Sequence, residues 1–335
     1  MKLNRSMTRA LAWTLIASGA LVACSKVPVT GRRQFNLLPD SLMNSLGEST
    51  YKTMLSDVTL SKGNDNAKTL QQVGNAIADA AGSDGDGYEW EYKLIQENDT
   101  INAWALPGGK TAVYTGLLPV VENEAGLAFV MGHEVGHATA SHGAERMSQQ
   151  LAVLGGLAGL YVYLDRKTEM SDDNKALVVA ALGLGAEVGV ILPFSRSHEK
   201  EADIIGMMYM AKAGYTPTES TKVWDRMEAA TGGSVMPDFL STHPSNDNRK
   251  SNLNEWMGQA KKKYQRSKQV SNDTRTLWTS DSASSGKSGG GKSASSSKGS
   301  SKGSSKGSGK GSGGGKGSSG GKGSGDSGSD RDRTR

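Results

Sequence analysis

The stretch that decides the fold is His133-Glu134-Val135-Gly136-His137, which lies in a segment with the apolar spacing of a helix. Two histidines four residues apart share one helix face, about 6 Å apart along the axis, so both can bind one metal ion. Glu134 is rotated by roughly 100° from His133, which places it beside such an ion rather than on it. A carboxylate in that place can take a proton from metal-bound water. The motif therefore predicts a zinc site with Glu134 as general base.

A third ligand must join the two histidines, because catalytic zinc is usually held by three protein residues. In metzincins a third histidine follows the second by six residues. That position holds Gly143 in this sequence, one residue after His142. His142 therefore misses the register, and we interpret it as a surface or helix-end residue.

A second predicted helix, residues 195–214, supplies better candidates. Glu199 and Asp203 are four residues apart and share one face of this helix. One carboxylate can bind the metal while the other accepts the ring N–H of a ligating histidine. Glu201 is expected to point nearly opposite to that face, and His198 to face away from it.

The motif around His133, together with Glu199-x-x-x-Asp203, resembles the gluzincin metallopeptidases. Four further motifs narrow the resemblance to the HtpX/CAAX-prenyl-protease family. These motifs are Asn102-Ala-Trp-Ala-Leu-Pro-Gly-Gly109, Phe194-Ser195-Arg196, Glu199-Lys-Glu-Ala-Asp203 and Ser241-Thr242-His243-Pro244. The resemblance covers residues 25–265 and is greatest to the soluble periplasmic members of the LoiP and BepA type.

The resemblance implies one zinc ion per chain with the ligands His133, His137 and Glu199. By the same resemblance, Asp203 would orient a ligating histidine. His243 would approach the metal from the far side, either stabilising the oxyanion or occupying the water position in a latent form. The segment 102–115 would supply an edge strand that aligns the substrate main chain, with the substrate-binding residues Asn102, Ala103, Trp104 and Ala105. Strand addition reads the peptide backbone, which suits broad specificity.

The hydrophobic patterns predict an α+β fold, with a mainly helical zincin-type domain beside a small antiparallel sheet. Residues 88–96 alternate as in a strand, and 101–106 and 111–115 are two further expected strands. Helical spacing dominates from residue 122 to 268. Two apolar runs, 151–164 and 176–194, are poor candidates for transmembrane helices. The first is too short to cross a bilayer, and the second contains a glutamate and a proline. We favour core or site-covering helices there, with a membrane-associated hairpin as the alternative.

The amino-terminal residues 1–23 have the form of a secretory signal peptide, with three basic residues before a 13-residue apolar run. The run ends at Leu21-Val22-Ala23-Cys24, and Cys24 is the only cysteine, which excludes an internal disulfide. This tetrapeptide resembles the lipobox of bacterial lipoproteins, which implies lipidation at Cys24. Ser25 stands where an inner-membrane lipoprotein usually has aspartate, so the resemblance implies the periplasmic face of the outer membrane. An ordinary signal peptide with an incidental cysteine is the alternative.

Charge is distributed unevenly along the 335 residues. Residues 281–335 contain 18 Gly and 19 Ser and carry a net charge of +7, whereas residues 24–280 carry −5. An acidic foldable part argues against a specific nucleic-acid partner. The expected organisation is a lipoprotein signal peptide (1–23), a lipidated tether (24–47), a zinc metallopeptidase domain (48–270) and a disordered Gly/Ser/Lys-rich tail (271–335). The tail can contact anionic surfaces through its charge.

Together these features predict a lipid-anchored zinc metalloendopeptidase for protein quality control. Its expected partners are unfolded or misassembled envelope proteins, which it would cleave when they are misfolded or stalled. The alternative is a proteolytically silent, zinc-bound chaperone or assembly factor for outer-membrane proteins. The two hypotheses share one ligand set, and they differ in whether Glu134 is needed.

Overall fold

We describe a computed structural model, which covers residues 24–186, 191–230, 238–243, 248–271 and 273–276. The predicted signal peptide and nearly all of the predicted tail lie outside these residues. The helices are α2 (Asp40–Leu55), α3 (Asp65–Ala81), α4 (Leu118–Val121), α5 (Glu124–Thr139), α6 (His142–Lys167), α7 (Asp172–Ala186), α8 (Leu192–Lys212), α9 (Glu219–Ala230), α10 (Asp238–Thr242) and α11 (Arg249–Arg266). The mainly helical α+β class is confirmed.

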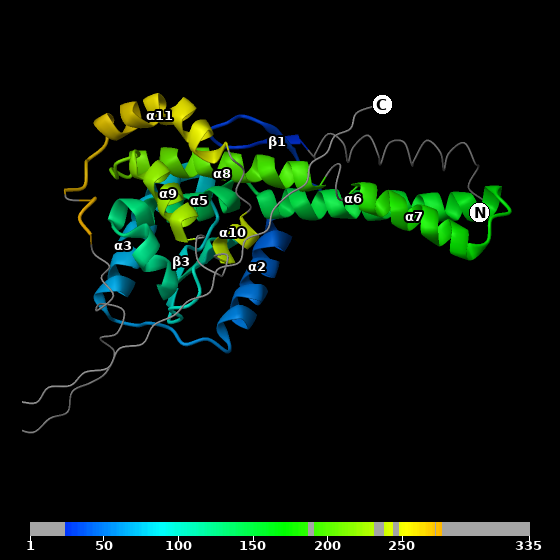
Figure 1. Ribbon diagram of the computed structural model, residues 1–335, viewed down its shortest axis with the longest axis horizontal. Coiled ribbons are helices and arrows are strands. Elements are labelled where there is room, and N and C mark those ends of the chain that lie inside the picture. Colours follow the sequence, from blue (N-terminus) through cyan, green and yellow to red (C-terminus); the bar gives the residue numbers. More distant parts are fainter. Residues whose placement is uncertain (1–23, 187–190, 231–237, 244–247, 272, 277–335) are drawn as a thin grey trace, which may run out of the picture. The chain divides into compact units, whose positions relative to one another are not determined.

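Helices α5 and α8 pack against each other at the centre of the described part, with α3, α9 and α11 around them (Figure 1). Glycine makes their close approach possible. A Cβ atom on Gly206 of α8 would lie 2.5 Å from the main-chain nitrogen of His133. A Cβ atom on Gly132 of α5 would lie 2.7 Å from the carbonyl oxygen of Gly206. The two helices that carry the predicted ligands are therefore held backbone to backbone.

Helix α5 begins with a capping residue, Asn123. The side chain of Asn123 accepts a hydrogen bond from the main-chain nitrogen of Gly126 at 2.8 Å, which satisfies one of the free N–H groups of the first turn. Leu127, Val130 and Met131 are completely buried or nearly so. The helix is apolar around most of its surface, as expected for a helix at the centre of a domain.

A mixed sheet of three strands, in the order β3 (Glu91–Ile95), β5 (Lys110–Tyr114), β4 (Ala103–Leu106), packs beside these helices. Strands β4 and β5 are antiparallel and form the hairpin expected around residues 107–109. The all-antiparallel pairing that we expected is not observed, because β3 runs parallel to β5. The chain crosses from β3 to the far side of β5 before it turns back, and this leaves β4 at one edge of the sheet.

The segment 24–47, expected to be a tether, belongs to the folded body. Strands β1 (Cys24–Lys26) and β2 (Arg33–Phe35) form an antiparallel pair, and Val27 between them is only 2% exposed, within the hydrophobic core. Arg32 makes buried ion pairs with helices α6 and α8. The body also continues past the predicted boundary at residue 270, because Asp273 accepts a hydrogen bond from the main-chain nitrogen of Thr216 at 2.6 Å.

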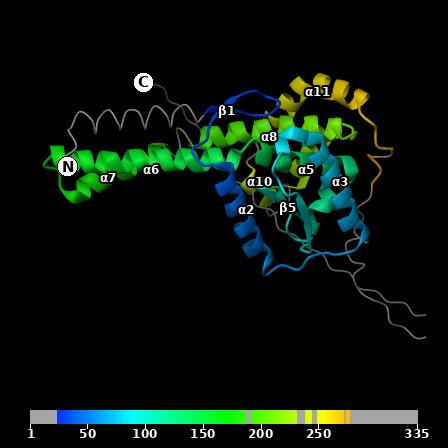
Figure 2. The ribbon, with the colours of Figure 1, turned by 180° about the vertical axis from the view of Figure 1, so that it is seen from behind.

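Helices α6 and α7 form an antiparallel hairpin that extends away from the other elements (Figures 1 and 2). Its apolar residues are not part of the core, since Leu154 is 64% exposed and Leu184 is 71% exposed. The favoured interpretation of this segment as core or site-covering helices was therefore wrong for the hairpin. None of the described helices combines the length and apolar character needed to cross a bilayer.

Candidate metal centre

Four side chains from α5, α8 and the end of α10 bring their donor atoms together, and they are His133, His137, Glu199 and His243. All four donor atoms lie within 4.8 Å of one another. The Nε2 atoms of His133 and His137 are 3.1 Å apart, and Oε1 of Glu199 is 3.4 Å from Nε2 of His137. Nδ1 of His243 is 3.2 Å from both Nε2 of His133 and Oε2 of Glu199.

This donor set fits zinc. Ligands about 2.0 Å from a tetrahedral ion are about 3.3 Å from one another, and imidazole nitrogen with carboxylate oxygen is a common zinc combination. The neighbouring donors here are separated by 3.1–3.5 Å. The predicted ligands His133, His137 and Glu199 are thus brought to one point, from two stretches more than 60 residues apart.

Glu134 lies beside the four donors and not among them, as its position on α5 predicts. It is 2% exposed, and its Oε1 has no hydrogen-bond partner among the described residues. The same atom lies 3.5 Å from Nε2 of His243. Burial raises the pKa of the Glu134 carboxyl above its ordinary value. A raised pKa makes this carboxylate a better proton acceptor, which suits a general base.

Asp203 is fully buried, and its Oδ1 is 3.0 Å from Nδ1 of His133, as expected for a residue that orients a ligand. Both of its oxygens also accept hydrogen bonds from Arg249. Burial alone would raise the pKa of Asp203, but Arg249 and His133 outweigh that effect and lower it. Asp203 therefore stays ionised and accepts the ring N–H of His133.

Arg249 is a residue of the centre that was not predicted from the sequence. Its guanidinium donates to Asp203 and, through Nη1, to Oε2 of Glu199 at 3.1 Å, and it lies 4.0 Å over the ring of Trp224. One signal was present in the sequence. Arg249 is the first residue of α11, where the helix dipole disfavours a cation, so its charge needs a partner elsewhere in the fold.

His142 is placed differently from our interpretation. It does begin a helix, α6, but it is 3% exposed and therefore not a surface residue. Its Nδ1 is 2.9 Å from Nδ1 of His137, and its Nε2 is 3.1 Å from Oε2 of Glu201. His198 is also buried, and its ring stacks on that of His142 with centroids 4.3 Å apart. Glu201 points away from Glu199 as expected, but into this second buried cluster.

A cavity of about 190 Å³ opens beside the four donors. Its lining includes Trp104 and Ala105 of β4 together with Glu134 and His137. The predicted edge strand is thus beside the centre. Asn102 serves the strand itself, because its carbonyl oxygen accepts from the main-chain nitrogen of Tyr114 at 3.0 Å.

That hydrogen bond fixes which main-chain groups of β4 are free to pair. Hydrogen-bonded and non-bonded pairs alternate in an antiparallel ladder, so Asn102 and Trp104 pair with β5 while Ala103 and Ala105 direct their main-chain groups outward. Ala105 therefore directs its main chain away from β5, where its N–H also donates to the carboxylate of Glu134. The edge beside the cavity can accept another strand.

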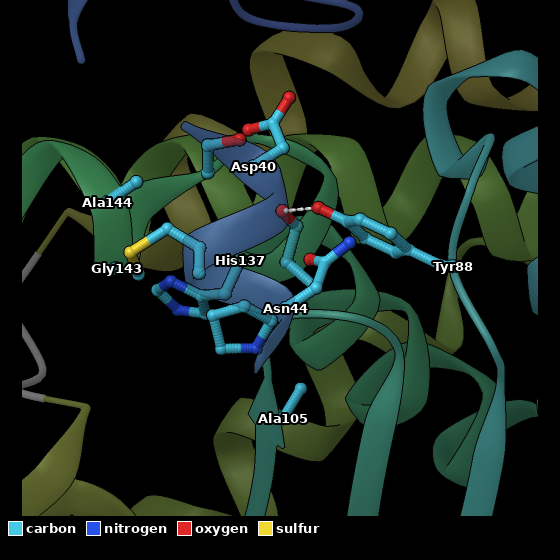
Figure 3. A pocket seen from close by; sticks show the side chains of 11 residues that line it. Asp40, Asn44, Tyr88, Ala105, His137, Gly143 and Ala144 are labelled. Carbon is cyan, nitrogen blue, oxygen red and sulfur yellow. Dashed lines mark hydrogen bonds between the residues drawn. The ribbon is translucent and has the colours of Figure 1, made fainter. Parts of the chain in front are cut away.

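A smaller pocket of about 60 Å³ shares His137 and Ala105 with this cavity (Figure 3). Asp40 and Asn44 of α2 form one wall, and Ala105 marks the end of β4 that reaches it. The hydroxyl of Tyr88 donates to the carbonyl oxygen of Ala138 at 2.8 Å and fixes the floor. The segment predicted to be a tether therefore contributes α2 to a wall of the centre.

The sequence matches peptidase family M48 over residues 64–257, a range that contains all four donor residues. The chain belongs to peptidase family M48. This M48 protein is accordingly a zinc metallopeptidase, and the mainly helical fold and the donor set agree with that assignment.

Among curated relatives, the mitochondrial metalloendopeptidase OMA1 of Saccharomyces cerevisiae is 33% identical over 258 residues, which cover 72% of this chain and 71% of the relative. The beta-barrel assembly-enhancing proteases are also similar. That of Yersinia pestis is 30% identical over 173 residues, or 50% of this chain and 34% of the relative, and that of Escherichia coli is 28% identical over 162 residues, or 47% and 32%. The expected resemblance to the BepA type is confirmed, and the similarity to OMA1 covers more of the chain.

Proposed function

We propose that this M48 peptidase is anchored through a lipid on Cys24 to the periplasmic face of a bacterial outer membrane, where it cleaves misfolded or stalled envelope proteins. The lipobox-like Leu21-Val22-Ala23-Cys24 supports the anchor. The similarity to beta-barrel assembly-enhancing proteases supports envelope proteins as substrates.

The open edge of β4 beside the cavity is the observation that supports unfolded proteins as substrates. A strand added to this edge is bound by main-chain hydrogen bonds, which every extended peptide can make. A folded protein has few free extended segments, because its strands are paired internally. The site therefore selects for chains that have lost their structure rather than for one side-chain sequence.

The side chains around the cavity have distinct tasks in peptide hydrolysis. A bound zinc ion would polarise the scissile carbonyl and lower the pKa of a water molecule. His133, His137 and Glu199 would hold the ion, and Asp203 keeps the ring of His133 in place. Glu134 accepts the proton and passes it to the leaving amine, since its free Oε1 lies beside the donors.

For His243, the sequence left two roles open, and we infer the latent one for this arrangement. Its Nδ1 is as close to Glu199 as the other donors are to one another, so it takes the fourth position that water would need. His243 follows directly after the short helix α10. A shift of α10 would withdraw the ring and free the position for water.

The decisive test is Glu134→Gln in the full chain, assayed for zinc content and for cleavage of casein and of an unfolded outer-membrane protein. We expect unchanged zinc content and a loss of about 10²- to 10⁴-fold in cleavage. Unchanged cleavage, or full function in the envelope without any cleavage, would favour the silent chaperone instead. Cys24→Ser tests the anchor separately, and it should release the protein from the membrane fraction without changing its activity.

A further inference from the structure

The two ligating histidines of α5 are oriented by different kinds of partner. Nδ1 of His133 faces a carboxylate, Asp203, at 3.0 Å. Nδ1 of His137 faces another imidazole, His142, at 2.9 Å. A ligating histidine needs a partner at its second nitrogen, because that partner fixes the tautomer and the ring direction. The partner of His137 must therefore be able to accept a hydrogen bond from the Nδ1–H group of His137.

The surroundings of His142 determine which of its nitrogens accepts. Its Nε2 lies 3.1 Å from Oε2 of Glu201, and an ionised carboxylate is an acceptor only. Nε2 of His142 must then carry the hydrogen, which leaves a lone pair on its Nδ1. That lone pair accepts the Nδ1–H of His137, so Nε2 of His137 presents its own lone pair to Glu199 and the other donors.

Glu201 is itself held by the amino-terminal segment. Nε of Arg32 donates to its Oε2 at 2.9 Å, and the hydroxyl of Thr30 donates to its Oε1. The two terminal nitrogens of Arg32 donate to Glu145 of α6 at 2.9 and 2.6 Å. Arg32 thus joins two buried carboxylates from different helices. A bidentate guanidinium of this kind holds its partners in a fixed geometry.

We propose that His142 is the positioning residue for His137, and that Glu201, held by Arg32, keeps His142 in the tautomer that this task requires. The series of contacts from His137 through His142 and Glu201 to Arg32 thereby makes the amino-terminal segment a structural part of the metal centre. The inference rests on the proposed role of His137 as a zinc ligand.

Two variants of one residue separate positioning from simple packing. In His142→Asn, the amide oxygen can occupy the place of Nδ1 and still accept from His137. In His142→Gln, the amide occupies the place of Nε2 and can reach Glu201, but no acceptor faces His137. The zinc dissociation constant of the full-length variants, measured by competition with a chelator, should rise about 10- to 100-fold for His142→Gln and stay within about threefold for His142→Asn.

His198→Gln is the matched control, because His198 stacks on the ring of His142 and pairs with Glu145 in the same buried cluster. Its zinc dissociation constant should stay within about threefold of the wild-type value. Thermal unfolding of each metal-free variant reports folding independently of zinc. Glu201→Leu, which removes the acceptor from His142, should weaken zinc binding about tenfold, and Glu201→Gln should restore most of it.

The outcomes distinguish this inference from the proposed function. If the wild-type protein binds zinc tightly and His142→Gln binds it equally tightly, His142 does not position His137. The same holds if His142→Asn loses as much affinity as His142→Gln while both remain folded. If the wild-type protein binds no zinc under replete conditions, the hydrolytic function itself fails.

Discussion

Arg249 grips Asp203 with two parallel hydrogen bonds, from Nε to Oδ2 at 2.7 Å and from Nη2 to Oδ1 at 2.8 Å. Both side chains are almost completely buried. A third hydrogen bond reaches Glu199, so this one cation compensates two carboxylates of the centre. Arg249 therefore ties the buried carboxylate that orients His133 to the carboxylate predicted to bind the metal.

Arg249→Met should destabilise the metal-free protein by about 3–5 kcal/mol, because it leaves two buried carboxylates without their cation. Arg249→Lys keeps the charge but cannot make the two parallel hydrogen bonds, so we expect an intermediate loss of stability. Urea unfolding of the metal-free proteins measures both. Equal stability of Arg249→Met and the wild type would contradict the assigned role.

Replacing His243 by alanine should increase peptide cleavage several-fold, because the fourth position at the donors then opens to water. Zinc content should be unchanged, since three ligands remain. Initial rates on an unfolded protein substrate test this, with Glu134→Gln/His243→Ala as the inactive control. A fall in rate would support the oxyanion role instead.

Gly206→Ala should destabilise the fold by about 1–3 kcal/mol, since the added methyl group meets the main chain of His133 at 2.5 Å. Gly155→Ala on α6 is the matched control. Among the described residues, no atom beyond its own stretch of helix lies within 4 Å of the added Cβ, so the higher helix propensity of alanine should stabilise the protein by about 0.5–1 kcal/mol. Thermal unfolding should show opposite signs for these two variants.

Ala105→Pro removes a main-chain N–H that faces both the open edge of β4 and the carboxylate of Glu134, and kcat/KM for an unfolded substrate should fall about three- to tenfold. Its melting temperature should change little, because proline is tolerated at edge positions outside the ladder. Leu106→Pro differs, since Leu106 pairs with Lys110 and the same replacement there should lower the melting temperature. Equal effects on stability would argue against a free edge at Ala105.

Acid should weaken the protein through Glu145. Burial alone would raise the pKa of this carboxyl, but its hydrogen bonds to His198 and Arg32 lower the pKa to about 2. Because the folded value lies below the unfolded one, Glu145 contributes stability above about pH 4.5 and loses it as the pH falls towards 2. The contribution is about 1–3 kcal/mol. The stability difference between the wild type and Glu145→Gln, followed by denaturant unfolding, should shrink over this range.

The ligand helices could be predicted because their signals are local. The spacing of His133 and His137 fixes a shared face on one helix, and that of Glu199 and Asp203 fixes a shared face on another. The predicted stop of the second helix at Gly214 is confirmed, since α8 ends at Lys212 and Gly214 adopts a φ of +90°, whereas the helix begins at Leu192 rather than at residue 195.

Arg249 and His142 could not be placed in this way, since their roles depend on contacts between distant segments. The register argument excluded His142 as a third ligand, and it is not among the four donors. His142 instead lies behind the ring of His137, where α6 and the amino-terminal segment pack. The parallel pairing of β3 with β5 was missed for the same reason, because strand order depends on how the connecting chain packs.

Strand β1 begins at Cys24, and eight residues later Arg32 is bonded beneath the metal centre. If Cys24 carries a lipid as proposed, no flexible linker separates the peptidase domain from the bilayer. The enzyme would then lie directly on the membrane surface and move along it by lateral diffusion. It would meet its clients within a thin layer next to the membrane, rather than sweep through the depth of the periplasm.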